Sequence, residues 1–197
     1  MRKIALIPAL LALSALPVMA QDAVDGPGPN LVITVADASG APKGTITLDL
    51  LEDVAPNHVA RLVELAEAGD YNGVVFHRVI DGFMAQTGDV RHGRADGDTS
   101  RAGTGGSDKP NLRAEFSDLP FERGTVGMAR SMDPDSANSQ FFINFAPAHF
   151  LNGEYTVIGQ LVDGWDVLDS IKRGDARANG AVRDPDQMLS VTVERAE

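Results

Sequence analysis

One stretch decides the fold, Tyr71 to Asp89, which reads YNGVVFHRVIDGFMAQTGD. It contains two apolar runs, 74–80 and 84–87, whose residue types favour extended backbone, so the stretch predicts two β-strands. The first run contains the polar residues His77 and Arg78, and the second contains Gln86 and Thr87. A buried arginine without a partner is costly. Arg78 is therefore either a residue at a barrel mouth, paired with an acid, or a donor aimed into an apolar cleft.

Similar runs recur on both sides of this stretch. They lie at 31–36, 44–51, 127–129, 140–144, 157–162 and 188–193. In the run 44–51 apolar residues alternate with other residues, which is typical of a strand with one buried face. With the two strands above, these runs predict eight short strands in all.

Two further segments predict helices. Residues 56–69 begin with Pro56, which suits a first helical turn, and they carry an apolar stripe at helical spacing. Residues 164–172 form the second helix, with Asp163 as its predicted N-cap. No repeat or linker divides the chain. The sequence therefore predicts a mainly β domain, a closed eight-stranded antiparallel β-barrel capped by two α-helices.

The start of the chain has the layout of a secretory signal peptide. Two basic residues precede the uncharged apolar run 4–16, and Val18 and Ala20 stand three residues and one residue before a cut. The alternative, a membrane anchor, needs a longer run to cross about 30 Å of hydrocarbon. We expect a signal peptide at 1–20, a flexible leader at 21–29 and the folded domain at 30–197.

The composition narrows the class of protein. The chain has 197 residues, 43% hydrophobic and 23% charged, as in ordinary globular proteins. Its 17 basic and 28 acidic residues give a formal charge of −11, and losing the two basic residues at the start leaves 15 against 28, or −13. Such an acidic surface disfavours nucleic acids and anionic membranes. With no cysteine, the chain has no disulfide, and an exported protein of this kind is expected in a bacterial periplasm.

Several catalytic motifs are missing from the sequence. It has no nucleophile elbow, no H-E-x-x-H zinc motif and no phosphate loop with lysine. The glycine-rich run 103–107 lacks that lysine and is expected to be part of a long exposed loop, 88–111. Neither the histidines nor the aspartates have the spacing of metal ligands. We therefore expect no metal and no cofactor, and predict instead an apolar pocket with a few fixed donors.

At these residues the sequence resembles the cyclophilin family of peptidyl-prolyl isomerases. The motif F-H-R-V-I-x-x-F-M-x-Q-x-G-D matches 76–89, and S-Q-F-F-I matches 139–143. The family's G-T-G-G loop matches 103–106, and its G-x-x-x-M-A strand matches 124–129. The resemblance covers about residues 30 to 195. Met128-Ala129-Arg130-Ser131 and Phe150-Leu151 look most like the bacterial, secreted branch.

The resemblance implies an eight-stranded barrel with two helices and a set of site residues. The catalytic arginine falls on Arg78, with Gln86 as its polar companion. The substrate-binding positions that the resemblance implies are Phe83, Met84, Ala129, Arg130, Ser131, Gln140, Phe142, Phe150, Leu151 and Tyr155.

Three departures from the eukaryotic members stand out. Arg130-Ser131 replaces Asn-Ala, Phe150 replaces a tryptophan and Tyr155 replaces a histidine. The loop 131–138 is also one residue longer. In the eukaryotic members the tryptophan N–H is understood to hold cyclosporin, so Phe150 implies an active isomerase that binds cyclosporin weakly.

The implied function is cis–trans isomerisation of X–Pro bonds, without a cofactor, in proline-containing polypeptides and unfolded exported proteins. We expect a monomer, because no coiled-coil or large apolar surface pattern is present. Two other classes remain as alternatives. A binding module of the same fold would hold proline segments without catalysis, and a small hydrolase on an unrelated barrel would need a nucleophile in its pocket.

Overall fold

The computed structural model describes residues 26–195. The predicted signal peptide, its cut after Ala20 and most of the predicted leader lie outside this range. The described chain forms nine strands and two α-helices, with four short 3-10 helices in the connections. The strands are β1 Asn30–Ala36, β2 Pro42–Leu50, β3 Val74–Val75, β4 Arg78–Ile80, β5 Met84–Thr87, β6 Thr125–Met128, β7 Phe141–Asn144, β8 Val157–Asp163 and β9 Gln187–Glu194. The α-helices are α1 Pro56–Glu67 and α2 Trp165–Ser170.

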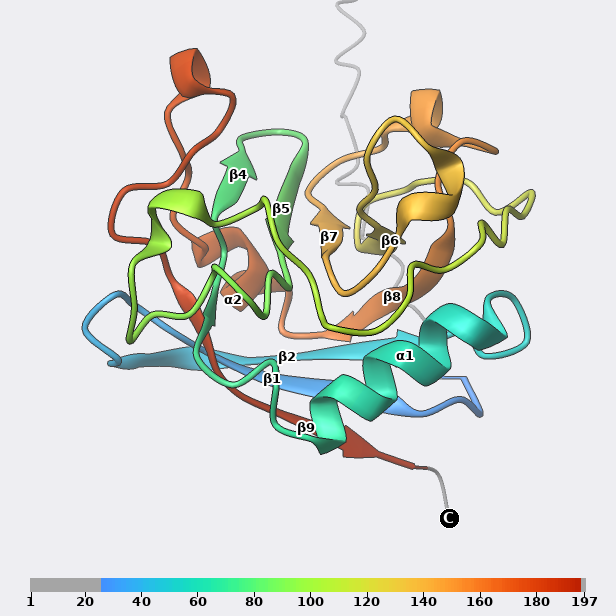
Figure 1. The fold of residues 1–197 in the computed structure, drawn as a ribbon, viewed down its shortest axis with the longest axis horizontal. Coiled ribbons are helices and arrows are strands. Elements are labelled where there is room, and N and C mark those ends of the chain that lie inside the picture. The colour runs from blue at the N-terminus through green and yellow to red at the C-terminus, as the bar shows by residue number, and fades with distance from the viewer. Residues whose placement is uncertain (1–25, 196–197) are drawn as a thin grey trace, which may run out of the picture.

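All described strands belong to one antiparallel sheet with the order β3-β9-β1-β2-β8-β6-β7-β5-β4. Figure 1 shows β1, β2 and β9 as one wall of the molecule and β4, β5, β7 and β6 as the opposite wall. The two edge strands, β3 and β4, are consecutive in the chain, so the sheet has to curl to bring its edges together. The prediction of a mainly β fold with two helices is confirmed.

The prediction of a closed eight-stranded barrel is wrong, because the sheet is a nine-stranded curled half-barrel. Residues 74–80, expected as one strand, form two: β3 pairs with β9, whereas β4 pairs with β5. Between them, Phe76 donates its N–H to the oxygen of Asp186, and the carbonyl of His77 accepts from Val182. The backbone of this link is therefore bound to the segment before β9, and no ladder joins β3 to β4.

The two helices differ in how well the sequence predicted them. Helix α1 begins at Pro56 as expected and buries His58, Val59, Arg61, Leu62, Leu65 and Ala66. Helix α2 is shorter than expected, and Asp163 is not its N-cap, because Gly164 holds that position with φ 86°. A Cβ at Gly164 would lie 2.3 Å from the oxygen of Thr45, so the close approach to β2 requires glycine.

The apolar side chains form two clusters. The larger one fills the space between the sheet and the helices and includes the inward residues of β1 and β2. The smaller one consists of Met84, Phe121, Phe142, Ala148, Leu151 and Val157. In this cluster the rings of Phe121 and Phe142 stack with centroids 5.7 Å apart. A Cβ at Gly127 would lie 2.5 Å from Phe142, so the missing side chain there makes room for that ring.

The long loop 88–111 is tied down by a single carboxylate. Asp89 is fully buried, and its two oxygens accept the N–H groups of Arg91 at 3.1 Å, His92 at 2.9 Å, Gly103 at 2.7 Å and Gly105 at 2.9 Å. Burial raises the pKa of Asp89, but these four hydrogen bonds outweigh it and hold the pKa below its ordinary value. The glycine-rich part of the long loop is therefore held in place by hydrogen bonds to Asp89, the residue two positions after β5.

Among residues 26–195, no helix has both the length and the apolar character that crossing a lipid bilayer requires.

Candidate active site

The guanidinium of Arg78 lies on β4 beside the smaller apolar cluster. Its Nη1 donates to Oε1 of Gln86 at 3.2 Å, across the register pair that joins β4 and β5. Its Nε and Nη2 donate to the main-chain oxygen and to Oδ1 of Asn179, at 3.1 and 3.2 Å. Partial burial lowers the pKa of Arg78, and Tyr155 opposes the shift, but an arginine remains charged at neutral pH. Of the two interpretations of Arg78, the structure supports the fixed donor, since no acid among residues 26–195 pairs with its guanidinium.

Gln86 is itself held by a chain of amides. Its Nε2 donates to Oε1 of Gln140 at 2.9 Å. Nε2 of Gln140 donates in turn to the carbonyl oxygens of Gly103 at 3.1 Å and Gly105 at 2.7 Å. Because arginine can only donate, the direction of every bond in this chain follows from it. The loop held by Asp89 therefore positions the amide of Gln140. Gln140 in turn positions the amide of Gln86, which accepts from Arg78.

Arg78 and Gln86 open on a largely apolar cavity of about 260 Å³. Its lining comprises Arg78, Phe83, Met84, Gln86, Ala129, Arg130, Phe142, Phe150, Leu151 and Tyr155. Met84, Phe142 and Leu151 are buried and form its floor, whereas Phe150 is 72% exposed and packs its ring against Phe83 at 5.4 Å. Serine, threonine, histidine, aspartate and glutamate are absent from the described residues of this lining, which gives a hydrolase no acid–base pair.

A second, more polar cavity of about 410 Å³ adjoins the first and shares Gln86, Ala129 and Arg130 with it. Ser131 and Gln140 line this second cavity and not the first. Thus all twelve site residues expected from the sequence border one of two connected hollows. Arg130 lies across their boundary, with its guanidinium 4.3 Å from the ring centroid of Tyr155 and bonded to the oxygen of Glu154 at 2.8 Å.

Two features of the site were not expected from the sequence. One is Asn179, which contacts Arg78 from a point 101 residues further along the chain. Its only signal was the turn-forming pair Asn179-Gly180, which says nothing about what the turn touches. The other is His77, whose ring lies beneath Gly103. Burial lowers the pKa of His77 to about 4, so its ring is neutral at neutral pH.

Titratable side chains do not gather into a metal centre. Among residues 26–195, no group of three or more histidines, aspartates and glutamates is arranged so that it could hold a metal ion.

Comparisons with known proteins agree with this geometry. The family described as "Cyclophilin type peptidyl-prolyl cis-trans isomerase/CLD" matches residues 32–193. A "Probable peptidyl-prolyl cis-trans isomerase" of Brucella suis biovar 1 (strain 1330) is 52% identical over 188 residues, which cover 94% of this chain and 92% of the relative.

Solved structures show the same fold. A cyclophilin from Hirschia baltica has a TM-score of 0.67 at 25% identity and covers 85% of this chain and 74% of its own. A cyclophilin-type isomerase from Cryptosporidium parvum, crystallised in the presence of the dipeptide Ala-Pro, has a TM-score of 0.69 at 24% identity over 85% and 99%. The resemblance inferred from the motifs is confirmed: the chain belongs to the cyclophilin-type peptidyl-prolyl cis-trans isomerases.

Proposed function

We propose that this isomerase uses Arg78 as its catalytic donor and acts on X–Pro bonds of exported polypeptides in the periplasm. The observation that carries the catalytic part is a charged guanidinium fixed by Gln86 at the wall of an otherwise apolar cavity. A relative with this fold was crystallised with Ala-Pro, and the cavity here has the size and apolar lining that suit a proline ring. The adjoining polar cavity would receive residues that precede the proline.

The chemistry follows from the electronic structure of the peptide bond. Rotation about X–Pro is slow because the C–N bond has partial double-bond character, with a barrier of about 18–20 kcal/mol. At the twisted transition state the conjugation is lost, and the imide nitrogen becomes pyramidal and basic. A donor aimed at this nitrogen stabilises the transition state and barely affects the planar ground state, which lowers the barrier. Arg78 supplies such a donor without any covalent step.

Gln86 has two tasks in this proposal. Its Oε1 accepts from Arg78 and so orients the guanidinium, while its Nε2 already donates one hydrogen to Gln140. The amide nitrogen has a second hydrogen, which can hold the carbonyl of the residue before proline. The apolar floor made by Met84, Phe142 and Leu151 keeps the ring still while the other side of the bond turns.

Replacing Arg78 tests the catalytic assignment. Arg78→Ala removes a charge-assisted hydrogen bond made mainly in the transition state, so kcat/KM should fall about tenfold to 150-fold. Arg78→Lys keeps the charge but not the planar fork and should recover only part of the loss. NMR exchange on a peptide with one X–Pro bond measures the rate, and thermal unfolding shows that the fold is intact. Near-native activity of the alanine variant would refute the assignment.

The same experiment separates the two alternative classes. A binding module without catalysis would bind the peptide yet leave its cis–trans exchange rate unchanged. A hydrolase would cleave the peptide, which mass spectrometry of the assay mixture detects.

The proposal of export rests on the sequence of residues 1–20 alone, with its basic start, short apolar run and small residues before Gln21. Slow X–Pro isomerisation limits the folding of many chains, so a periplasmic isomerase would assist newly exported proteins. Amino-terminal sequencing of the native protein should find Gln21 first, in the soluble periplasmic fraction. Recovery of the intact amino terminus from membranes would support the anchor instead.

A further inference from the structure

We infer that Asn179 is a positioning residue that fixes the guanidinium of Arg78 for catalysis. This inference rests on the proposed role of Arg78 and adds a second element to the site, the segment between α2 and β9. Asn179 accepts two hydrogen bonds from the guanidinium. Its main-chain oxygen accepts from Nε at 3.1 Å, and its Oδ1 accepts from Nη2 at 3.2 Å.

These bonds leave the guanidinium of Arg78 with few free N–H groups. A guanidinium has five N–H groups in one plane. Asn179 takes two of them and Gln86 takes a third, and the second hydrogen of Nη1 faces the sulfur of Met84 at 3.9 Å. The remaining hydrogen on Nη2 is left for a substrate. Because bonds from opposite edges hold the plane, the guanidinium can neither swing about its stem nor turn about the Nε–Cζ bond without losing a partner.

The backbone of the turn explains why asparagine occupies this position. Asn179 has φ 53° and ψ 35°, the left-handed conformation that asparagine tolerates better than most residues. In the same turn Gly180 accepts from the N–H of Val79 at 2.8 Å, and Gly174 donates to the oxygen of Val79 at 2.9 Å. Ala181 forms an isolated bridge with Arg78. The turn is thus bonded along β4, beside which it rises in Figure 1, and this places the oxygen of Asn179 against Nε.

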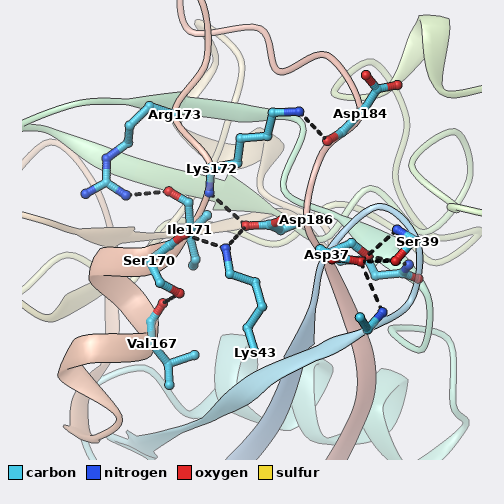
Figure 2. Close-up of polar contacts among 12 residues, drawn as sticks. Asp37, Ser39, Lys43, Val167, Ser170, Ile171, Lys172, Arg173, Asp184 and Asp186 are labelled. Carbon is cyan, nitrogen blue, oxygen red and sulfur yellow. Dashed lines mark hydrogen bonds and ion pairs between the residues drawn. The ribbon is translucent and has the colours of Figure 1, made fainter.

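The two ends of the segment between α2 and β9 are also hydrogen-bonded to the rest of the fold. Figure 2 shows the carboxylate of Asp186, which is 3% exposed, accepting from Nζ of Lys43 at 2.7 Å and from the N–H of Lys172 at 2.8 Å. Nζ of Lys172 donates to the main-chain oxygen of Asp184 at 2.9 Å. These bonds join the end of α2 to the start of β9 and to β2. Asn179 itself is exposed, but hydrogen bonds hold both ends of the segment that carries it.

Asn179→Gly is the decisive variant, because glycine keeps the left-handed backbone and the main-chain oxygen but removes Oδ1. We expect kcat to fall about threefold to tenfold with KM little changed, since the loss affects orientation of the donor rather than the apolar pocket. Asn179→Asp retains an oxygen in the same place and should recover most of the rate. The matched control is Asp184→Gly, because Asp184 is the other described non-glycine residue with positive φ, on the same segment but away from Arg78. It should leave the rate unchanged.

Two readouts separate positioning from a general loosening. Combined with Arg78→Lys, Asn179→Gly should cost much less than it does in the native background, because the lysine lacks the Nε–H and Nη2 groups that Asn179 holds. In ¹⁵N-arginine spectra, the signal that Arg78→Lys removes should show faster rotation about Nε–Cζ in Asn179→Gly than in the native protein. An unchanged rate in Asn179→Gly, or an equal loss in both backgrounds, would overturn the inference while leaving Arg78 as donor. Native activity in Arg78→Ala would instead overturn the proposed function itself.

Discussion

Replacing Asp89 by asparagine should destabilise the protein and slow catalysis together. In the native protein each carboxylate oxygen accepts two N–H groups, and the side chain is fully buried. An amide NH₂ at either position faces two donors and leaves both unsatisfied. At about 1–3 kcal/mol for each orphaned donor, the free energy of unfolding should fall by about 2–6 kcal/mol. For a domain of this size the Tm should fall by roughly 5–20 °C.

The effect should also depend on pH. The pKa of Asp89 in the folded protein lies below its ordinary value of 3.8, so the ionised group contributes its full stability above that pH. The contribution is lost as the pH falls through the folded pKa. Thermal unfolding of both proteins from about pH 7 to about pH 2.5 should show a gap in Tm that narrows at the acid end. In the same variant kcat/KM should drop, because Gly103 and Gly105 hold Gln140.

Asp108→Asn is the matched control, since Asp108 lies on the same loop with its side chain 97% exposed and pairs only with Arg91 among the described residues. Its Tm should stay close to the native value, as for exposed ion pairs in general. A Tm of Asp89→Asn within about 3 °C of the native one, or a gap of constant size over the whole pH range, would refute the reasoning.

Three further predictions concern the pocket floor, cyclosporin and acid stability. Gly127→Ala should lower stability by about 1–3 kcal/mol and reduce kcat/KM, because the added Cβ would lie 2.5 Å from Phe142; urea unfolding and the exchange assay measure both, and an unperturbed variant would contradict the packing. Phe150→Trp restores an indole N–H at the exposed rim and should strengthen cyclosporin inhibition by roughly 5-fold to 150-fold with activity retained; nanomolar inhibition of the native protein would show that this position is not the contact. Burial raises the pKa of Glu115, but hydrogen bonds from His58 and Asn57 outweigh it and hold the pKa below 4.5. Glu115→Gln should therefore lower stability by about 1–3 kcal/mol above that pH, with the difference from the native protein shrinking as acid protonates Glu115; equal curves in denaturant would speak against it.

The sequence predicted those parts of the site that lie on regular, apolar segments. The residue types of β4, β5 and β7 are typical of strands. The approximate placement of Arg78, Gln86 and Phe142 on them therefore followed from local pattern and motif. Asn179 could not be found in this way, because the contact depends on how the segment after α2 returns along β4. The split of 74–80 into two strands was missed for a related reason. Residue types there favour extended backbone throughout, and only the competition among partner strands decides where the ladder breaks.

The loop 88–111 shows the same limit from the other side. Its composition of glycine and polar residues resembles free loops elsewhere, and composition cannot show that one buried carboxylate gathers four of its N–H groups. The N-cap of α2 was missed because contact with β2, rather than helix chemistry, requires Gly164.

The order of strands has a consequence for how the chain reaches its native state. Strand β9, which ends at Glu194, lies between β1 and β3 and pairs with both. In a chain that leaves the ribosome amino end first, one edge of β1 therefore has no partner strand until Gln187–Glu194 has been made. Strands that are far apart in the sequence pair slowly, because the entropy of closing the long loop is lost before the new contacts contribute stability. Until Gln187–Glu194 has been made, the sheet therefore lacks the strand that joins β3 to β1.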